Sequence, residues 1–367
     1  MAVAVPERLV ITTDSVGGIW RYCVDVAGEL ERRGTRVTIA GFGPSPARGQ
    51  LREVAAAGAE VAWLEAPLDW TVEGPEGAER GATALDQLLR ERRPDLLHLN
   101  APPLASRLRA PVPRLVAAHS CLATWWRSMR AGALPPEWQE HASAMAAGLR
   151  AAEVVVAPSA AFAEALVEVY GSLPALRVVP NGSRSIPSAK KKGRFVFAAG
   201  RWWDEAKNLA CLDAAAADIA WPLHAAGPLQ GPLSAAPPSH HVVCLGPLDH
   251  QEVAQWLAMT PIFVSSARYE PFGLAVLEAA SAGAALVLSD IPTFRELWDE
   301  AALFLDPQRP QAWARAVNSL IEDDTLRERR GQLAQRRAAS FTLASQADRL
   351  LQAYRLAAEA QRQGMVP

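Results

Sequence analysis

Apolar and polar positions follow two rhythms along this chain. Short apolar runs bounded by turn residues, such as RLVITT at 8–13 and RVTIAGF at 36–42, predict buried strands. Longer segments between such runs carry apolar residues at helical spacing. IWRYCVDVAGELERRG is one of them, and it ends at Gly34, a residue type typical of the position just beyond a helix. Strands that alternate with helices predict parallel sheets with helices on both faces. The predicted strands are 8–13, 36–42, 61–64, 95–100, 114–120 and 154–159 in the first half, and 194–200, 221–227, 241–246, 261–266 and 284–290 in the second.

The two series of strands and helices are similar in size, which predicts an α/β protein with two Rossmann-like, doubly wound domains. Between them, VVPNGSRSIPSAKKKG at 178–193 is rich in Pro, Gly, Ser and Lys, and its apolar periodicity lapses. The tail from Phe341 again has apolar residues at helical spacing, so it predicts an amphipathic last helix that needs a partner surface. We expect a first domain over 1–180, a second over 181–345 and the last helix over 346–367.

The composition limits which binding partners and which cellular compartment we expect for this protein. A net charge of −2 over 367 residues argues against nucleic acids and anionic membrane surfaces as partners. The short basic cluster of Lys190, Lys191, Lys192 and Arg194 is interpreted as a solvated linker. The four cysteines are far apart and lack metal-ligand spacing, which predicts neither disulfides nor a zinc site and fits a reducing cytosol. With no apparent signal peptide and no apolar run of membrane-spanning length, we expect a cytoplasmic protein.

Ligands of open α/β sheets bind outside the carboxyl ends of the strands, so polar residues there are candidates for function. In the first half, Gly17 and Gly18 open the helix after the first strand, where backbone N–H groups can meet an anion. The dinucleotide fingerprint GxGxxG is absent, which disfavours a nicotinamide cofactor. His119 and Asn100 each end a predicted strand, and taken alone a packing role is the preferred interpretation of each.

Tryptophans are numerous, and most are expected in the core. Trp125 and Trp126 could form a stacking wall for a sugar or an aromatic acceptor, but adjacent helical residues face different ways, so at least one of them is expected in the core. Candidate acceptor contacts in the first domain are Trp20, Trp70, Asn100, Trp125 and Trp126.

The second half offers two cations beside a helix. In RFVFAAGRWWDEAKNLACL, Arg201 directly follows a predicted strand and Lys207 lies at the start of the next helix. Two cations at a helix N-terminus can hold a diphosphate and neutralise the charge that builds on a leaving phosphate. The alternative is that they pair with Asp204 and Glu205 on the surface.

The segment SSARYEPFGLAVLEAASAG carries two glutamates around an apolar run. We expect a helix over 272–282 with Pro271 near its first turn, so that Glu270 lies at the mouth of the helix. Glu278 would then lie roughly 10 Å further along the axis. Carboxylates accept hydrogen bonds from hydroxyl groups, so an elongated sugar nucleotide could contact both. The alternative is a helix N-terminal acid favoured by the dipole, with the other glutamate facing solvent.

Within this segment, EPFGLAVLE resembles the E-x7-E motif of retaining glycosyltransferase family 4, whose members have the two-domain GT-B fold. The resemblance extends over most of the chain. GGIWRYCVDVAGELERRG is similar to the family's first glycine loop and helix, VVPNG to its passage between domains, and GRWWDEAKN to its phosphate-binding segment. It implies transfer of a hexose-type sugar, with retention, from a UDP-, GDP- or ADP-linked donor to a small-molecule or glycan acceptor.

The resemblance also implies roles for individual residues. Arg201 and Lys207 would bind the donor phosphates, and Glu278 the ribose hydroxyls. His119 would face the donor sugar, and the last helix would cross back to the first domain. The donor sugar would be held by Glu270 and the backbone of Phe272, Gly273 and Leu274, with Gly17 and Gly18 approaching the donor or the acceptor.

The same resemblance implies catalysis on one face of the sugar, with the leaving phosphate helping to deprotonate the acceptor. Glu270 is then a positioning group, not a nucleophile. No D-x-D pair follows a strand, and two cations can replace Mg²⁺, so neither a metal nor another cofactor is expected. Two departures from the family pattern are Asn208, where a glycine often follows the lysine, and IPTFREL, where Glu296 lacks the usual preceding glycines.

Other functions stay open at this point. A GT-B epimerase would release a free sugar, and a phosphorylase would consume inorganic phosphate. A glycoside hydrolase would use Glu270 and Glu278 as its acid pair, but roughly 10 Å lies at or beyond the ~6.5–9.5 Å of inverting enzymes and leaves the two cations unexplained. A non-catalytic sugar-nucleotide-binding module is the remaining alternative.

Overall fold

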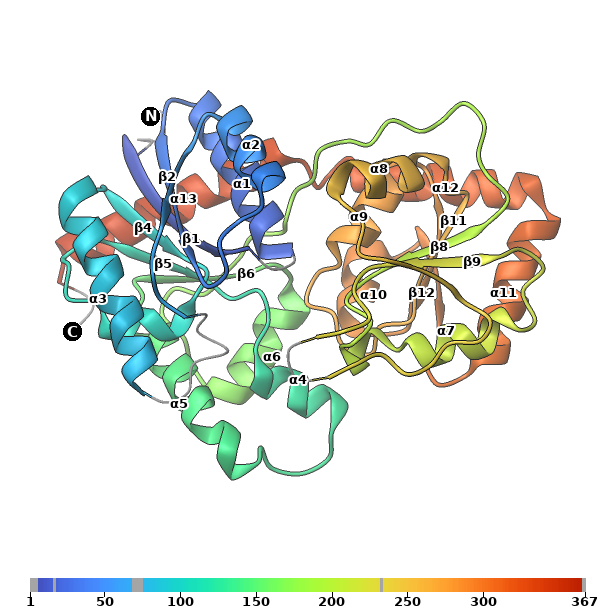
Figure 1. Cartoon of the computed structure of the whole chain (residues 1–367), viewed down its shortest axis with the longest axis horizontal. Coiled ribbons are helices and arrows are strands. Elements are labelled where there is room, and N and C mark those ends of the chain that lie inside the picture. The colour runs from blue at the N-terminus through green and yellow to red at the C-terminus, as the bar shows by residue number, and fades with distance from the viewer. Residues whose placement is uncertain (1–5, 16–17, 68–74, 232–233, 365–367) are drawn as a thin grey trace. The chain divides into compact units, whose positions relative to one another are not determined.

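The computed structural model describes residues 6–15, 18–67, 75–231 and 234–364. The chain forms two compact units (Figure 1). The first unit comprises Met1–Gly182 together with Leu343–Pro367, and the second comprises Ser183–Thr342. The sequence predicted boundaries at 180/181 and 345/346. In the structure the units divide at 182/183 and 342/343.

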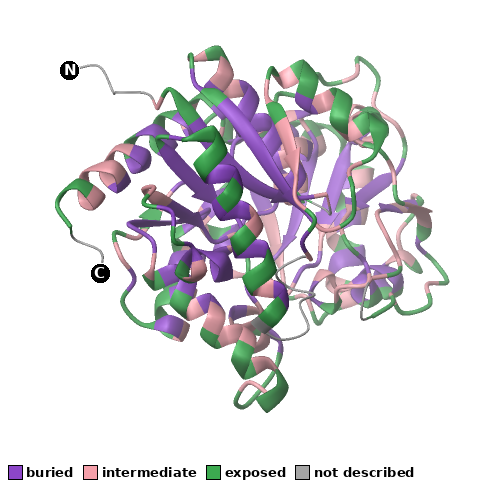
Figure 2. Ribbon diagram, turned by 60° about the vertical axis from the view of Figure 1, so that its left-hand side comes forward, coloured by how far each residue is buried: buried purple, intermediate pink, exposed green. Residues whose placement is uncertain are grey.

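The first unit contains a parallel sheet in the order β3-β2-β1-β4-β5-β6-β7. Its central strands are buried while the surrounding helices carry exposed faces, as Figure 2 shows. The strands are β1 (Arg8–Asp14), β2 (Arg36–Phe42), β3 (Glu60–Trp63), β4 (Leu96–Leu99), β5 (Arg114–Ala117), β6 (Val154–Ala157) and β7 (Arg177–Val178). The helices are α1 (Gly18–Arg32), α2 (Arg48–Ala57), α3 (Pro75–Arg92), α4 (Leu122–Met129), α5 (Pro136–Arg150), α6 (Ala160–Tyr170) and α13 (Leu343–Arg362), with a 3₁₀ turn η1 (Pro102–Arg107).

The second unit contains a parallel sheet in the order β10-β9-β8-β11-β12-β13. Separate apolar clusters lie on its two faces, one under α7 and α11 and the other under α8, α9, α10 and α12. The strands are β8 (Val196–Ala199), β9 (Leu223–Ala226), β10 (Val243–Gly246), β11 (Ile262–Ser265), β12 (Ala285–Ser289) and β13 (Ala302–Leu305). The helices are η2 (Glu205–Lys207), α7 (Leu209–Ala216), α8 (His250–Met259), α9 (Leu274–Ser281), α10 (Pro292–Trp298), α11 (Pro310–Glu322) and α12 (Asp324–Ala338).

The predicted fold class is confirmed, because both sheets are parallel and covered by helices on both faces. All eleven predicted strands are present. Two short edge strands, β7 and β13, were not predicted. β7 has only two residues, too few to give an apolar run. β13 is a short apolar run, ALFL, that sequence reasoning overlooked.

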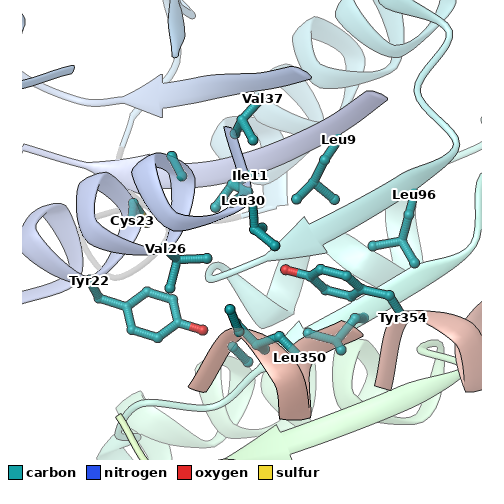
Figure 3. Packing of buried hydrophobic residues seen from close by; sticks show 14 of the residues in the cluster. Leu9, Ile11, Tyr22, Cys23, Val26, Leu30, Val37, Leu96, Leu350 and Tyr354 are labelled. Atoms are coloured by element: carbon teal, nitrogen blue, oxygen red, sulfur yellow. The ribbon is translucent and has the colours of Figure 1, made fainter. Parts of the chain in front are cut away.

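The last helix packs on the first unit, as expected. Leu350 and Tyr354 of α13 lie among core residues of α1, β1 and β4, which Figure 3 shows from close by. This apolar face was the one that lacked a partner in the sequence. Burial among strands of the first unit stabilises it by roughly 1.5–3 kcal/mol for each large apolar side chain.

The two places where the chain passes between units are each fixed by local bonds. In the second unit, Ser183 and Thr342 form a parallel bridge, and the Ser183 amide donates to the Phe341 carbonyl at 3.2 Å. In the first unit, the Gly182 amide donates to Gln346 Oε1 at 2.9 Å. Both crossings are therefore held side by side at the ends of their units.

The basic cluster expected to be a solvated linker is only partly so. Lys190 and Lys191 are exposed, but Lys192 is half-buried. Its Nζ donates to the carbonyls of Ala258 and Ala282, at 2.9 and 2.7 Å. These carbonyls lie at the C-terminal ends of α8 and α9, where a cation is favoured by the helix dipole. Lys192 thus ties two helix ends together.

We expect the substitution Lys192→Met to destabilise α8 and α9 by about 1–3 kcal/mol, because it removes two charge-assisted hydrogen bonds to helix-end carbonyls. Hydrogen exchange of peptides from these helices measures the effect as faster opening. The exposed neighbour provides the control, since Lys191→Met should change exchange by no more than about 0.5 kcal/mol. Equal exchange rates in both variants would show that the bonds of Lys192 to the two helix ends do not stabilise them.

Candidate functional site

The strongest cluster of charged residues lies at the carboxyl ends of β8 and β11, which are neighbours in the second sheet. Lys207 ends η2, in the segment after β8, and Glu270 lies in the loop after β11. Lys207 Nζ and Glu270 Oε2 are 2.7 Å apart. Their side chains are 16% and 20% exposed, so the pair is shielded but reachable. Two candidates far apart in sequence are brought into direct contact.

The charge of Glu270 is set by opposing effects. Burial disfavours its ionised form, but the charge and hydrogen bond of Lys207 outweigh burial, with smaller help from the Phe272 amide and Arg201. As a result, the pKa of Glu270 lies below its usual value. At neutral pH the site therefore holds a carboxylate, which accepts hydrogen bonds and donates none.

Arg201 lies beside this pair and is more exposed. Its guanidinium is 3.9 Å from Asp204 and lies 5.3 Å from the centre of the Trp203 ring. The Asp204 carboxylate also caps η2 by accepting from the Ala206 amide at 3.0 Å. The alternative for both cations was pairing with Asp204 and Glu205 on the surface. Arg201 forms such a pair at the long distance given above, whereas Lys207 pairs with Glu270 instead.

Two residues hold Lys207 in place: Ser266, which sequence reasoning missed, and Asn208, which it noted only as a departure from the family pattern. Ser266 Oγ donates to the carbonyls of Lys207 and Asn208, at 3.2 and 3.0 Å. Asn208 Nδ2 in turn donates to the carbonyls of Ser266 and Pro307, at 3.1 and 2.9 Å. The position of Ser266 at the end of PIFVSS, directly beside β8, is the signal that could have identified it.

The backbone explains the departure at Asn208. Its φ of 59° and ψ of 49° place it in the left-handed region, which glycine enters freely and asparagine enters more readily than most other residues. The side-chain bonds of Asn208 hold the loop in this conformation. Asparagine is thus accommodated at a position whose backbone also suits glycine.

The helix after Glu270 starts later than predicted, and this is a correction. α9 begins at Leu274, and Gly273 precedes it with a φ of 90°. Pro271 and Phe272 therefore lie in the loop, because the left-handed glycine interrupts any helix before it. The Phe272 amide points at Glu270 Oε1 at 3.5 Å, a long contact, and the Phe272 ring is buried.

The position of Glu278 changes with that correction. Glu278 is in the second turn of α9 and is half-exposed, whereas its neighbours Leu277 and Ala279 are buried. The expected axial separation of roughly 10 Å assumed one helix running from Glu270, so it has no basis in this structure. Leu274, also a predicted sugar contact, is the first residue of α9.

Glycines end three adjacent strands next to Lys207. Gly200, Gly227 and Gly246 lie at the carboxyl ends of β8, β9 and β10. Gly227 has a φ of 126°, and a Cβ there would lie 1.8 Å from the Gly200 carbonyl oxygen. Its amide donates to the Gly246 carbonyl at 2.7 Å. We call these three strand ends the glycine ledge. The Lys207 stem packs over Gly200, Gly227 faces the Gly200 carbonyl, and at Gly246 an added Cβ would have no atom within 4 Å.

In the first unit, His119 and Asn100 meet. His119 lies in the loop after β5, past the strand that was predicted to include it. Its Nε2 is 2.7 Å from Asn100 Oδ1, and burial lowers the pKa of His119 to about 4. Asn100 is buried, and its amide nitrogen donates to the Thr12 carbonyl at 2.7 Å. Both ends of its side chain thus already have protein partners, and its expected role as an acceptor contact stays a prediction.

The aromatic candidates divide into core and surface. Trp20 is buried in the core of the first unit, and its indole N–H points at Glu53 Oε2 at 3.4 Å. Its expected role as an acceptor contact stays a prediction. An amphipathic helix must bury one face, and Trp20 lies on that face of α1. Trp125 and Trp126 on α4 are half-buried, with the Arg130 guanidinium 5.3 and 6.0 Å from their rings.

The remaining candidates of the first unit are two glycines and one tryptophan. Gly18 is the exposed first residue of α1, while Gly17 and Trp70 lie outside the described residues. Glu296 lies within α10. Across the described ranges, no group of three or more His, Cys, Asp or Glu side chains is placed to hold a metal ion. That a metal is not required stays a prediction.

Family profiles match both parts of the chain. Residues 16–183 match Glycosyltransferase Family 4, and residues 184–337 match Glycosyl transferases group 1. A D-inositol 3-phosphate glycosyltransferase of Jonesia denitrificans is 30% identical over 118 residues, which are 32% of this chain and 28% of that protein. The matched part thus spans less than a third of the curated relative.

Solved structures agree with the fold over nearly the whole length. Sucrose-phosphate synthase from Thermosynechococcus elongatus has 18% identity and a TM-score of 0.78, with 95% of this chain and 98% of that chain covered. HepE from Anabaena, solved in complex with UDP and glucose, has 17% identity and a TM-score of 0.74, with 94% and 98% covered. At these identities the likeness shows the two-domain glycosyltransferase architecture.

Proposed function

We propose that this chain, a glycosyltransferase of the family 4 type by its two matched segments, transfers a sugar from a nucleoside diphosphate sugar to a hydroxyl-bearing acceptor. The observation that carries this proposal is the shielded Lys207–Glu270 pair with Arg201 beside it. Two cations that suit a diphosphate, beside a carboxylate that can accept from sugar hydroxyls, support this proposal. The complex of HepE with UDP and glucose supports a UDP-linked donor as the first choice.

The two cations have a different task from the carboxylate. Lys207 and Arg201 bind the diphosphate and stabilise the negative charge that builds on it as the bond to the sugar breaks. Glu270 is ionised, so it accepts hydrogen bonds from sugar hydroxyls and orients the ring. Glu278 on α9 accepts from the ribose hydroxyls, and the glycine ledge formed by Gly200, Gly227 and Gly246 admits the rest of the nucleotide.

The reaction proceeds on one face of the sugar, with retention. The bond between the anomeric carbon and the phosphate oxygen breaks, and its electron pair leaves with the diphosphate. The acceptor oxygen forms the new bond to that carbon and gives its proton to a phosphate oxygen. Glu270 is engaged by Lys207, which suits a positioning role and not a covalent intermediate. Two protein cations supply the charge stabilisation that a metal gives elsewhere.

Thermal unfolding with UDP, GDP, ADP and TDP, each in buffer containing EDTA, tests the donor site. One diphosphate should raise the unfolding temperature, since a ligand at about 100 times its Kd stabilises by about 2.7 kcal/mol. Inorganic phosphate at the same concentration is the control for a nonspecific anion effect. If none of the four nucleotides shifts the transition, either with EDTA or with Mg²⁺ in its place, the donor site is wrong. A shift that appears only when Mg²⁺ replaces EDTA would contradict metal independence.

A panel of the matching nucleotide sugars then separates an enzyme from a binding module. We expect release of the nucleoside diphosphate in the presence of a polyhydroxylated acceptor, and slower hydrolysis without one. Tight binding with no turnover across the panel would favour a non-catalytic module. The described residues include no helix long and apolar enough to cross a membrane.

A further inference from the structure

Two histidines lie in one buried polar network of the first unit, and their ring nitrogens are used differently. His98 on β4 has both nitrogens bonded, with Nε2 3.3 Å from the Tyr22 hydroxyl and Nδ1 2.7 Å from the Tyr354 hydroxyl. Figure 3 shows these tyrosines, which come from α1 and α13. His98 is fully buried, and burial, with a smaller contribution from His119, lowers its pKa to about 3. Its role is to join α1, β4 and α13.

His119 has only one nitrogen bonded. Nε2 lies 2.7 Å from Asn100 Oδ1. Within the residues that the structure describes, Nδ1 of His119 has no hydrogen-bond partner, and it does not belong to the buried atoms that lack one. This nitrogen therefore keeps some accessible surface although most of the ring is enclosed. It is the one imidazole nitrogen of the network that can reach a ligand.

The neighbours of Asn100 fix which end of its amide faces His119. The other end lies 2.7 Å from the Thr12 carbonyl oxygen, which can only accept. The NH₂ group must therefore point there, where it also lies 3.2 Å from Cys23 Sγ. The amide oxygen is left for His119, and an amide oxygen cannot donate. Consequently the proton of the imidazole is on Nε2.

We propose that Asn100 is a positioning residue that holds the His119 proton on Nε2, so that Nδ1 accepts a hydrogen bond from a substrate hydroxyl. This inference rests on the proposed function for the identity of the substrate, but not for the proton position. The Tyr22 ring packs edge-on against His119, with ring centres 4.5 Å apart and planes at 70°, and so holds the imidazole plane.

The arrangement selects a class of ligand. Burial keeps His119 neutral at pH 7, so Nδ1 presents a lone pair and no positive charge. A hydroxyl or N–H group can donate to it, whereas a carboxylate or phosphate would meet a second acceptor and be repelled. The part of the substrate that faces His119 is therefore a neutral, hydroxyl-bearing portion of a sugar, and not a phosphate or an acidic sugar group.

Nitrogen-15 spectra of the whole chain, labelled at its seven histidines, test the proton position without any substrate. His119→Phe identifies the signal. In the wild type at pH 7 we expect a protonated Nε2, with a slowly exchanging N–H proton, and an unprotonated Nδ1. An imidazole protonated on Nδ1, or on both nitrogens, would overturn the proposal. This measurement on the wild type does not depend on whether a variant of Asn100 folds.

Variants separate Asn100 from the rest of the network. Asn100→Leu should remove the slowly exchanging Nε2 proton, because its acceptor is gone. Tyr22→Phe is the matched control, since it removes the bond to His98 but keeps the ring against His119. The Nε2 signal should persist there. If it is lost in Tyr22→Phe and kept in Asn100→Leu, the assignment to Asn100 is wrong.

A double-mutant cycle tests the catalytic consequence. Asn100→Leu should lower kcat/KM by about 10- to 100-fold, as expected for a misplaced contact group. In the His119→Phe background the same change should add little, because Asn100 acts through His119. Independent losses would indicate a purely structural role and refute the coupling. If no nucleotide sugar is turned over, the proposed function fails, but the spectra still decide where the proton is.

Discussion

Replacing Lys207 by methionine should lower kcat/KM for the best nucleotide sugar by about 10²- to 10³-fold, the loss typical of one group that stabilises developing charge. Methionine keeps much of the aliphatic stem, which packs over Gly200, but removes the ammonium group. The loss has two sources. The diphosphate loses a cation, and Glu270 loses the partner that keeps its pKa low. Steady-state kinetics and nucleotide-induced stabilisation measure both.

The control for this prediction is a lysine of the same unit. Lys191 is exposed and outside the site, so Lys191→Met should leave kcat/KM within about twofold of wild type. The double variant of Lys207→Met with Glu270→Gln should lose less than the product of the single losses, because the two groups form one pair. Full activity in Lys207→Met would exclude the pair as the phosphate site.

The substitution Gly227→Ala should destabilise the second unit by about 3–5 kcal/mol. Two penalties combine at this position. A φ of 126° is strained for any residue with a side chain, and the new Cβ would lie 1.8 Å from the Gly200 carbonyl oxygen. β8 and β9 must then separate at their carboxyl ends, which also disrupts the ledge beside Lys207. Pulse proteolysis in urea, with fragments of the two units followed separately, measures the shift.

Gly246→Ala isolates one of the two penalties. Gly246 also has a positive φ, of 70°, but a Cβ there would have no atom within 4 Å. Its cost should be only about 1–2 kcal/mol, from backbone strain alone. The first unit should unfold at an unchanged urea concentration in both variants. Equal effects of Gly227→Ala and Gly246→Ala would show that the close approach to Gly200 does not matter.

The fold could be predicted from the sequence because burial in parallel sheets leaves continuous apolar runs. RVTIAGF matches β2 residue for residue, and the amphipathic tail matches α13. The boundaries that failed lie at residues whose conformation depends on the backbone and not on hydrophobicity. Gly273 is the main example, since its left-handed φ excludes Pro271 and Phe272 from α9 although their side chains would suit a first turn.

The candidate site was predictable in part, for a related reason. Arg201, Lys207 and Glu270 stand at strand ends, where position in the sheet alone suggests function. The contact of Lys207 with Glu270 could not be derived, because it depends on the placement of β8 beside β11. Ser266 was missed because its bonds go to backbone carbonyls of another loop. Asn100 was assigned outward because its buried partners, Thr12 and Cys23, come from other elements.

The two adjacent crossings at 182/183 and 342/343 have a consequence for the order of events during synthesis. The second unit is a contiguous insertion, so all of its residues are available once the ribosome has passed Thr342. The first unit is made earlier, but its core includes Leu350, Tyr354 and Ala357 of α13. The half of the chain that is translated first therefore closes last, and until then its apolar surface is the part exposed to chaperones and to aggregation.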